Sequence, residues 1–157
     1  MRHYEDSLKV PASPEDVFAF VDDFGRFSSH MSQSSWMMGG GKMEISVDEG
    51  QGKKVGSLVR MGGRIFGIYL HLDEVVTEHD PPRAKVWKTV GAPKLLVIGQ
   101  YQMALTIRPL ADKSSLLRIS IDYELPTRNA WMGKLFGQMY AKWCVQQMIQ
   151  GVRHQLA

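Results

Sequence analysis

An alternating pattern of apolar and polar residues runs through the middle of the chain for about ninety residues, beginning near residue 36. This period of two is typical of β-strands with one buried face, and a long series of such strands predicts an antiparallel sheet. Clusters of glycine, proline and aspartate mark the turns between the strands. We expect strands at 42–47, 56–61, 65–78, 84–90, 95–108 and 117–125, with turns at 50–52, 62–63, 80–83, 91–93 and 111–113.

One strand and one helix precede this region. Alternation predicts a strand at residues 3–10, and the following Ser13 and Pro14 are typical of a helix N-cap and a first helical residue. Apolar residues at helical spacing continue this helix until Gly25 ends it. A second short helix is expected at residues 27–31.

A long helix is expected after the sheet, from Thr127 or Asn129 to about residue 155. One sector of this helix is apolar or small along its whole length, and small residues permit close approach to a neighbour. We therefore expect this sector to lie on the sheet. It consists of Gly133, Gly137, Ala141, Cys144 and Met148.

The first half of this helix carries more apolar surface than a sheet alone can cover. The extra apolar residues are Trp131, Met132, Leu135 and Met139, and the basic residues beside them are Arg128, Lys134 and Lys142. We favour a lid of residues 24–38, rich in Phe, Met and Trp, as the cover. Two alternatives stay open: a basic amphipathic helix that contacts an anionic membrane, and a homodimer interface through Trp131, Met132 and Leu135.

Short motifs agree with this order of elements. Residues 10–18 (VPASPEDVF) and 21–23 (VDD) connect the first strand to the first helix, Val55-Gly56-Ser57 opens a strand, and residues 78–83 (EHDPPR) form a proline-containing hairpin. The chain thereby resembles the helix-grip fold of the START, polyketide cyclase and Bet v 1-like (SRPBCC) superfamily. The resemblance implies an α+β domain over residues 1–157. In it, a curved antiparallel sheet of six or seven strands wraps around the C-terminal helix, with two short helices after the first strand.

This resemblance also implies a mostly apolar cavity between the sheet and the long helix. Members of the superfamily bind lipids, sterols, polyketides, aromatic products or quinones, so we expect binding or carriage of a hydrophobic small molecule. For each residue expected to line the cavity, simple core packing is the alternative. The expected lining is Met43, Ile45, Met61, Tyr101, Met103, Leu105, Ile119 and Ile121 from the strands, opposite Phe136, Tyr140 and Met148.

A minority of the superfamily catalyses cyclisation or dehydration of polyketides, which makes an enzyme of this type the alternative function. Tyr69, His71 and Asp73 alternate with an apolar row, and only one of the two rows can face the helix. An inward polar row could move protons in such a reaction. The cost of burying polar groups favours the apolar row inside. The apolar row is Ile68, Leu70 and Leu72.

Arg60 and Arg64 could likewise face either the helix or water. One inward arginine could hold an acidic or carbonyl-bearing ligand. The alternative is a solvated strand face. Arg60 and Tyr101 join Tyr69 and His71 as the weak catalytic candidates. Cys144 lies in the small-residue sector without an obvious base, so we expect it to be structural.

Charge and cysteine content exclude several other classes. The net charge is +3, and the basic segment 125–157 contains only four Lys or Arg. These are too few and too widely spaced to bind the phosphates of a nucleic acid. The five histidines show no metal-ligand spacing, and four of them are expected in exposed or terminal positions, so neither a metal nor a cofactor is expected. With one cysteine and no apolar leader or membrane span, we expect a soluble protein of the cytoplasm.

Overall fold

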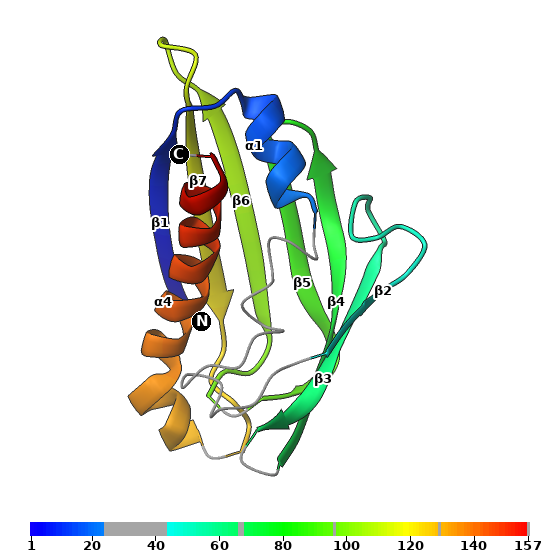
Figure 1. Cartoon of the computed structure of the whole chain (residues 1–157). Coiled ribbons are helices and arrows are strands. Elements are labelled where there is room, and N and C mark those ends of the chain that lie inside the picture. The colour runs from blue at the N-terminus through cyan, green and yellow to red at the C-terminus, as the bar shows by residue number, and fades with distance from the viewer. Residues whose placement is uncertain (24–43, 66–67, 96, 129, 157) are drawn as a thin grey trace.

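The computed structural model describes residues 1–23, 44–65, 68–95, 97–128 and 130–156 (Figure 1). Seven strands and two helices lie in these ranges. In chain order they are β1 (Arg2–Val10), α1 (Pro14–Val21), β2 (Glu44–Val47), β3 (Leu58–Ile65), β4 (Ile68–Asp80), β5 (Ala84–Lys94), β6 (Tyr101–Pro109), β7 (Ser115–Tyr123) and α4 (Ala130–Leu156).

The strands form one antiparallel sheet in the order β1-β7-β6-β5-β4-β3-β2. The sheet is strongly curved, and both helices lie on its concave side, with α4 along β1 and β7 (Figure 1). This arrangement confirms the helix-grip fold predicted from the sequence. The second short helix, expected at 27–31, falls outside the described residues.

Helix α1 begins as the sequence predicts and ends earlier. The Ser13 side chain accepts a hydrogen bond from the backbone amide of Asp16 at 3.2 Å, and Pro14 is the first helical residue. The helix ends at Val21, with Asp22 as its C-cap. It therefore stops short of the expected end at Gly25, which lies outside the described residues. The early end places Asp22 where its carboxylate reaches the sheet.

Alternation along β6 and β7 correctly predicts which side chains lie on the concave, buried side of the sheet. On β6 and β7 every second residue is buried, and these residues form the centre of the core together with the inward residues of β4. The buried apolar and aromatic residues on these two strands are Tyr101, Met103, Leu105, Ile107, Leu117, Ile119, Ile121 and Tyr123.

Two predicted turns lie within strands instead. Gly62 and Gly63 continue β3 and pair with β4, and a Cβ at Gly62 would come within 2.7 Å of the Tyr69 hydroxyl. These glycines therefore lie in the strand, where the Tyr69 side chain lies close over Gly62, and do not reverse the chain. Residues 91–93 form a bulge in β5, where Gly91 adopts a φ of +71°.

Strand β6 begins at Tyr101 and not at residue 95 as predicted. The preceding residues cross beneath α4: the Gly99 amide donates to the Glu124 carbonyl at 2.8 Å, and a Cβ at Gly133 would lie 2.9 Å from the Val97 carbonyl. Close approach of this segment to α4 therefore requires the small residues of the helix. All five members of the predicted small sector are buried.

Candidate functional site

The outward face of β4 carries the residues that sequence reasoning considered for catalysis. Tyr69 and His71 are exposed, and the exposed Arg60 of β3 lies with its Nε 3.8 Å from the Asp73 carboxylate. The cyclase hypothesis thus loses three of its four candidates, because none of these side chains faces α4. Tyr101 alone is buried.

The inward face of β4 is apolar at first, as the cost of burial predicts. Leu70 and Leu72 are buried, whereas Ile68 is exposed. The expectation is wrong for Ile68 because this residue opens β4 at the end of the strand, beyond the core.

The same inward row continues to Glu74, a buried carboxylate that sequence reasoning missed. Glu74 is 2% exposed, and the Tyr101 hydroxyl donates a hydrogen bond to its Oε2. Its Oε1 has no hydrogen-bond partner among the described residues. Burial raises the pKa of Glu74 to about 7, although Tyr101, Lys85 and Trp87 act in the opposite direction. The signal was available, since Glu74 has the same parity as Leu70 and Leu72.

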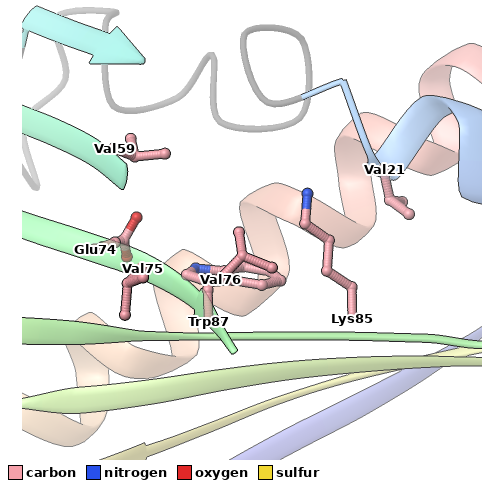
Figure 2. Close-up of a pocket in the computed structure, with 7 residues that line it drawn as sticks. All are labelled: Val21, Val59, Glu74, Val75, Val76, Lys85 and Trp87. Atoms are coloured by element: carbon pink, nitrogen blue, oxygen red, sulfur yellow. The ribbon is translucent and has the colours of Figure 1, made fainter. Parts of the chain in front are cut away.

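A small pocket of about 10 Å³ adjoins this carboxylate (Figure 2). This volume is about that of one enclosed water position. The picture shows Glu74 at one end of the pocket and Lys85 at the other, with Trp87 and Val76 between them in this view. The lining residues are Val21, Val59, Glu74, Val75, Val76, Lys85 and Trp87.

Lys85 is also buried, and its charge is paired with α1 and not with Glu74. Its Nζ donates to Oδ1 of Asp22 at 2.8 Å, and Nε2 of His79 lies 3.0 Å from the same carboxylate. Burial lowers the pKa of Lys85, with Asp22 acting in the opposite direction. His79 was expected in an exposed position, but only 15% of its side chain is exposed because it packs edge-on against Phe18. The Asp22 carboxylate therefore fixes the end of α1 to the sheet.

Tyr140 and Cys144 of α4 lie in the same interior as Glu74 and Tyr101. Burial raises the pKa of Tyr140 and of Tyr101 well above the ordinary tyrosine value. It also raises the pKa of the Cys144 thiol to about 12, so this thiol stays protonated and is a poor nucleophile. Among these interior groups, Glu74 is therefore the one that titrates near neutral pH.

A larger cleft lies at the end of the sheet where β4 begins and β5 ends. Its volume is about 510 Å³, within the roughly 300–1,000 Å³ typical of small-molecule sites. Lys94, Gln100 and Arg128 contribute hydrogen-bond donors, and Glu124 contributes a carboxylate. The remaining described lining is mostly apolar and consists of Ile68, Leu70, Ala92, Pro93, Leu95, Ile98, Gly99, Leu125, Pro126 and Thr127.

The residues predicted to line a cavity divide into four groups. Ile45 and Tyr140 are partly buried against the core, Phe136 is exposed on the side of α4 turned away from the sheet, and Met43 lies outside the described residues, as do the proposed lid residues 24–38. The described members do not line the cleft at the end of the sheet. The buried members are Met61, Tyr101, Met103, Leu105, Ile119, Ile121 and Met148.

Two further findings concern the described residues alone. They contain no cluster of three or more His, Cys, Asp or Glu side chains that could hold a metal ion. None of the helices built from them is long and apolar enough to cross a membrane.

Comparison with known families agrees with this architecture. Residues 1–157, the whole chain, match the family described as "Polyketide cyclase / dehydrase and lipid transport". The chain belongs to this family. None of the curated proteins compared with it matches the sequence.

Members of this fold with solved structures are similar over nearly the whole chain. The structure of TTHA0849 from Thermus thermophilus has a TM-score of 0.69 at 13% identity, covering 98% of this chain and 95% of that one. Truncated norcoclaurine synthase from Thalictrum flavum has a TM-score of 0.66 at 16% identity, covering 96% and 90%. Ara h 8.0201 has a TM-score of 0.63 at 11% identity, covering 98% and 99%. At such identities the likeness shows the Bet v 1-like fold.

Proposed function

We propose that the protein binds a hydrophobic small molecule, of the lipid, polyketide, aromatic or quinone-like kind, at the end of the sheet, in the cleft that the segment leading into the C-terminal helix helps to line. The observation that carries this proposal is the cleft of about 510 Å³ at the end of the sheet. Its size suits a small ligand, and the family description includes lipid transport. Burial of apolar ligand surface against Leu70, Leu95 and Ile98 supplies the driving force.

The polar groups of the cleft restrict the ligand further. Lys94, Gln100 and Arg128 are donors, and the Gln100 amide is oriented by a 3.1 Å hydrogen bond to the Gly91 carbonyl in the bulge of β5. Such donors suit a ligand that carries a carbonyl or an acidic group at one end of an apolar body.

A matched pair of variants, each with one alanine replaced by tryptophan, tests this site. Ala92 is exposed and lines the cleft, and Ala111 is exposed in the β6–β7 turn outside it. We expect Ala92→Trp to weaken binding of the fluorescent probe anilinonaphthalene sulfonate about tenfold or more, and Ala111→Trp to leave it unchanged. Native mass spectrometry before and after organic extraction would identify a co-purified ligand. Equal probe affinity in both variants, or no binding by the unsubstituted protein, would contradict the proposal.

A second candidate is a cyclase- or dehydrase-type enzyme, favoured by Glu74; it requires the core to open around a substrate, because the pocket beside Glu74 holds only about 10 Å³ and Glu74 does not line the larger cleft. As a carboxylate, a buried group with a pKa of about 7 whose Oε1 has no hydrogen-bond partner among the described residues would take a proton from the carbon beside a carbonyl and then return it to a departing hydroxyl. The Tyr101 hydroxyl holds the carboxyl in place. A norcoclaurine synthase of the same fold has been solved with dopamine and hydroxybenzaldehyde, which supports aromatic carbonyl compounds as trial substrates.

Glu78 provides the control for this candidate, because it is an exposed glutamate on the same strand. With an aromatic β-hydroxyketone as trial substrate and the loss of water followed by mass spectrometry, Glu74→Gln should lower turnover about a hundredfold or more. Glu78→Gln should leave turnover unchanged. Turnover that survives Glu74→Gln would remove Glu74 from the chemistry.

We place this function in the cytoplasm. Cys144, the single cysteine of the sequence, is a buried free thiol, which agrees with a reducing compartment.

A further inference from the structure

An apolar stripe lies on the side of α4 that faces away from the sheet. Trp131, Leu135 and Met139 follow one another at intervals of four residues, so they share one side of the helix. They are 58%, 65% and 45% exposed. At about 100° of rotation per residue, this side lies opposite the buried Gly133 and Gly137. The helix thus shows a second apolar face to its surroundings, and exposed Phe136 widens it.

The charged side chains of α4 and of the segment just before it are all basic. Lys134 and Lys142 are exposed on α4, and exposed Arg128 precedes the helix. The sequence contains no aspartate or glutamate from residue 125 to residue 157. None of these three cations forms an ion pair with a described residue. An exposed apolar stripe bordered by unpaired cations is typical of an interfacial helix.

We infer that this face of α4 docks on an anionic lipid surface. The Trp131 ring and the Leu135 and Met139 side chains would enter the boundary between headgroups and acyl chains, and Lys134 and Lys142 would contact anionic headgroups. A tryptophan is well suited to this depth because its ring is apolar and its indole N–H is polar.

Charge argues against a second copy of this chain as the occupant. Two copies that pair through the same face of α4 would bring Lys134 and Lys142 of one copy near those of the other, and the helix offers no carboxylate to compensate them. A lipid surface supplies the missing negative charge.

The docking face adjoins the proposed ligand cleft. Pro126, Thr127 and Arg128 line that cleft and immediately precede the first turn of α4. Docking would therefore bring the cleft close to the bilayer, which suits transfer of an apolar ligand. This consequence rests on the proposed function, whereas docking itself does not.

Vesicle sedimentation tests the electrostatic part of this inference. The protein should bind vesicles of phosphatidylcholine with about 30% phosphatidylglycerol and not vesicles of phosphatidylcholine alone, and added salt should weaken the binding. Lys134→Gln and Lys142→Gln should each lower the partition coefficient about fivefold. Lys88→Gln, at an exposed lysine of β5, should leave it unchanged. Failure to bind the anionic vesicles, or equal binding to both kinds, would overturn the inference.

A double substitution tests the apolar part. Trp131→Ser with Leu135→Ser should lower vesicle binding about tenfold or more, because both side chains are exposed and their loss leaves the core intact. The control is Val47→Ser with Val55→Ser, two exposed valines far from α4 in the sequence. Unchanged binding by the α4 variant would overturn the inference. A dimer in analytical ultracentrifugation that this variant abolishes would also overturn it, because a second copy would then cover the face.

Ala92→Trp separates this inference from the proposed function. Its substituted side chain lines the cleft and not the stripe. Ala92→Trp should bind vesicles normally while it loses the apolar probe. Loss of vesicle binding in this variant would contradict docking through α4 alone.

Discussion

The two faces of β4 show how differently one strand can use its polar residues. Outward, Tyr69 and His71 are exposed, and their rings lie next to each other in a tilted arrangement with centroids 5.9 Å apart. Inward, Glu74 is buried next to Tyr101, with one oxygen that has no partner among the described residues and a pKa near 7. The outward residues, Tyr and His, are of types common in catalytic sites. On the inward face, however, burial raises the pKa of the Glu74 carboxyl. Environment, and not residue type, therefore separates the two faces.

The largest expected difference between the faces is in packing. Leu72 is 1% exposed, so Leu72→Ala should lower the free energy of unfolding by about 2–5 kcal/mol through lost burial and the cavity it leaves. Tyr69→Ala on the outward face should lower it by less than about 1 kcal/mol. Urea unfolding followed by circular dichroism measures both values. Similar losses in the two variants would show that the faces are not divided as described.

The next difference is in pH dependence. Because burial raises the pKa of Glu74 from 4.5 to about 7, the neutral form stabilises the fold fully below pH 4.5, and this contribution is lost as the pH rises through 7. The shift corresponds to about 3 kcal/mol. As the pH rises from 5 to 8, the unsubstituted protein should therefore lose stability that Glu74→Gln keeps. The difference in the free energy of unfolding between the two should shift in favour of Glu74→Gln. Glu78→Gln should show no such gain, and a flat difference for Glu74→Gln would contradict a buried carboxyl.

Tyr101→Phe tests the hydrogen bond to Glu74 on the inward face. The Tyr101 hydroxyl donates to Glu74 and so favours the charged carboxylate. Its loss should raise the pKa of Glu74 further and lower the stability at pH 8 by about 1–3 kcal/mol, with a smaller loss at pH 5. Thermal unfolding at the two pH values measures this difference. An equal loss at both values would mean that Tyr101 contributes packing and no hydrogen bond to a titrating group.

The smallest effects are expected on the outward face. His71→Ala and Arg60→Ala should each change the free energy of unfolding by less than about 0.5 kcal/mol, because both side chains are exposed and the Arg60–Asp73 pair is a surface ion pair. Probe binding should also be unchanged in both variants. A strong effect on binding would return these residues to the functional site.

The fold could be predicted in large part from the sequence. Alternation and helix signals predicted seven strands, the first helix and the long C-terminal helix, because these patterns depend on local periodicity. Two of the errors came at glycines, at 62–63 and 91–93, where the chain continues along a strand or forms a bulge instead of a turn. Sequence alone does not separate these uses, since the partner strand decides between them.

The candidate site was harder to predict. Parity along β4 would have placed Glu74 inside, but a glutamate in an inward row is unexpected because burying its charge is costly. Its partner Tyr101 is distant in the chain, and the two meet only through the order of β4, β5 and β6 in the sheet. The Asp22–Lys85–His79 contacts likewise depend on where α1 ends.

The most direct test of the inward site is a carbon-13 NMR titration of the Glu74 side-chain carboxyl, assigned by comparison with Glu74→Gln. We predict a midpoint near pH 7 in the folded protein. A midpoint near the ordinary glutamate value of 4.5 would contradict a desolvated acid on the inward face of β4.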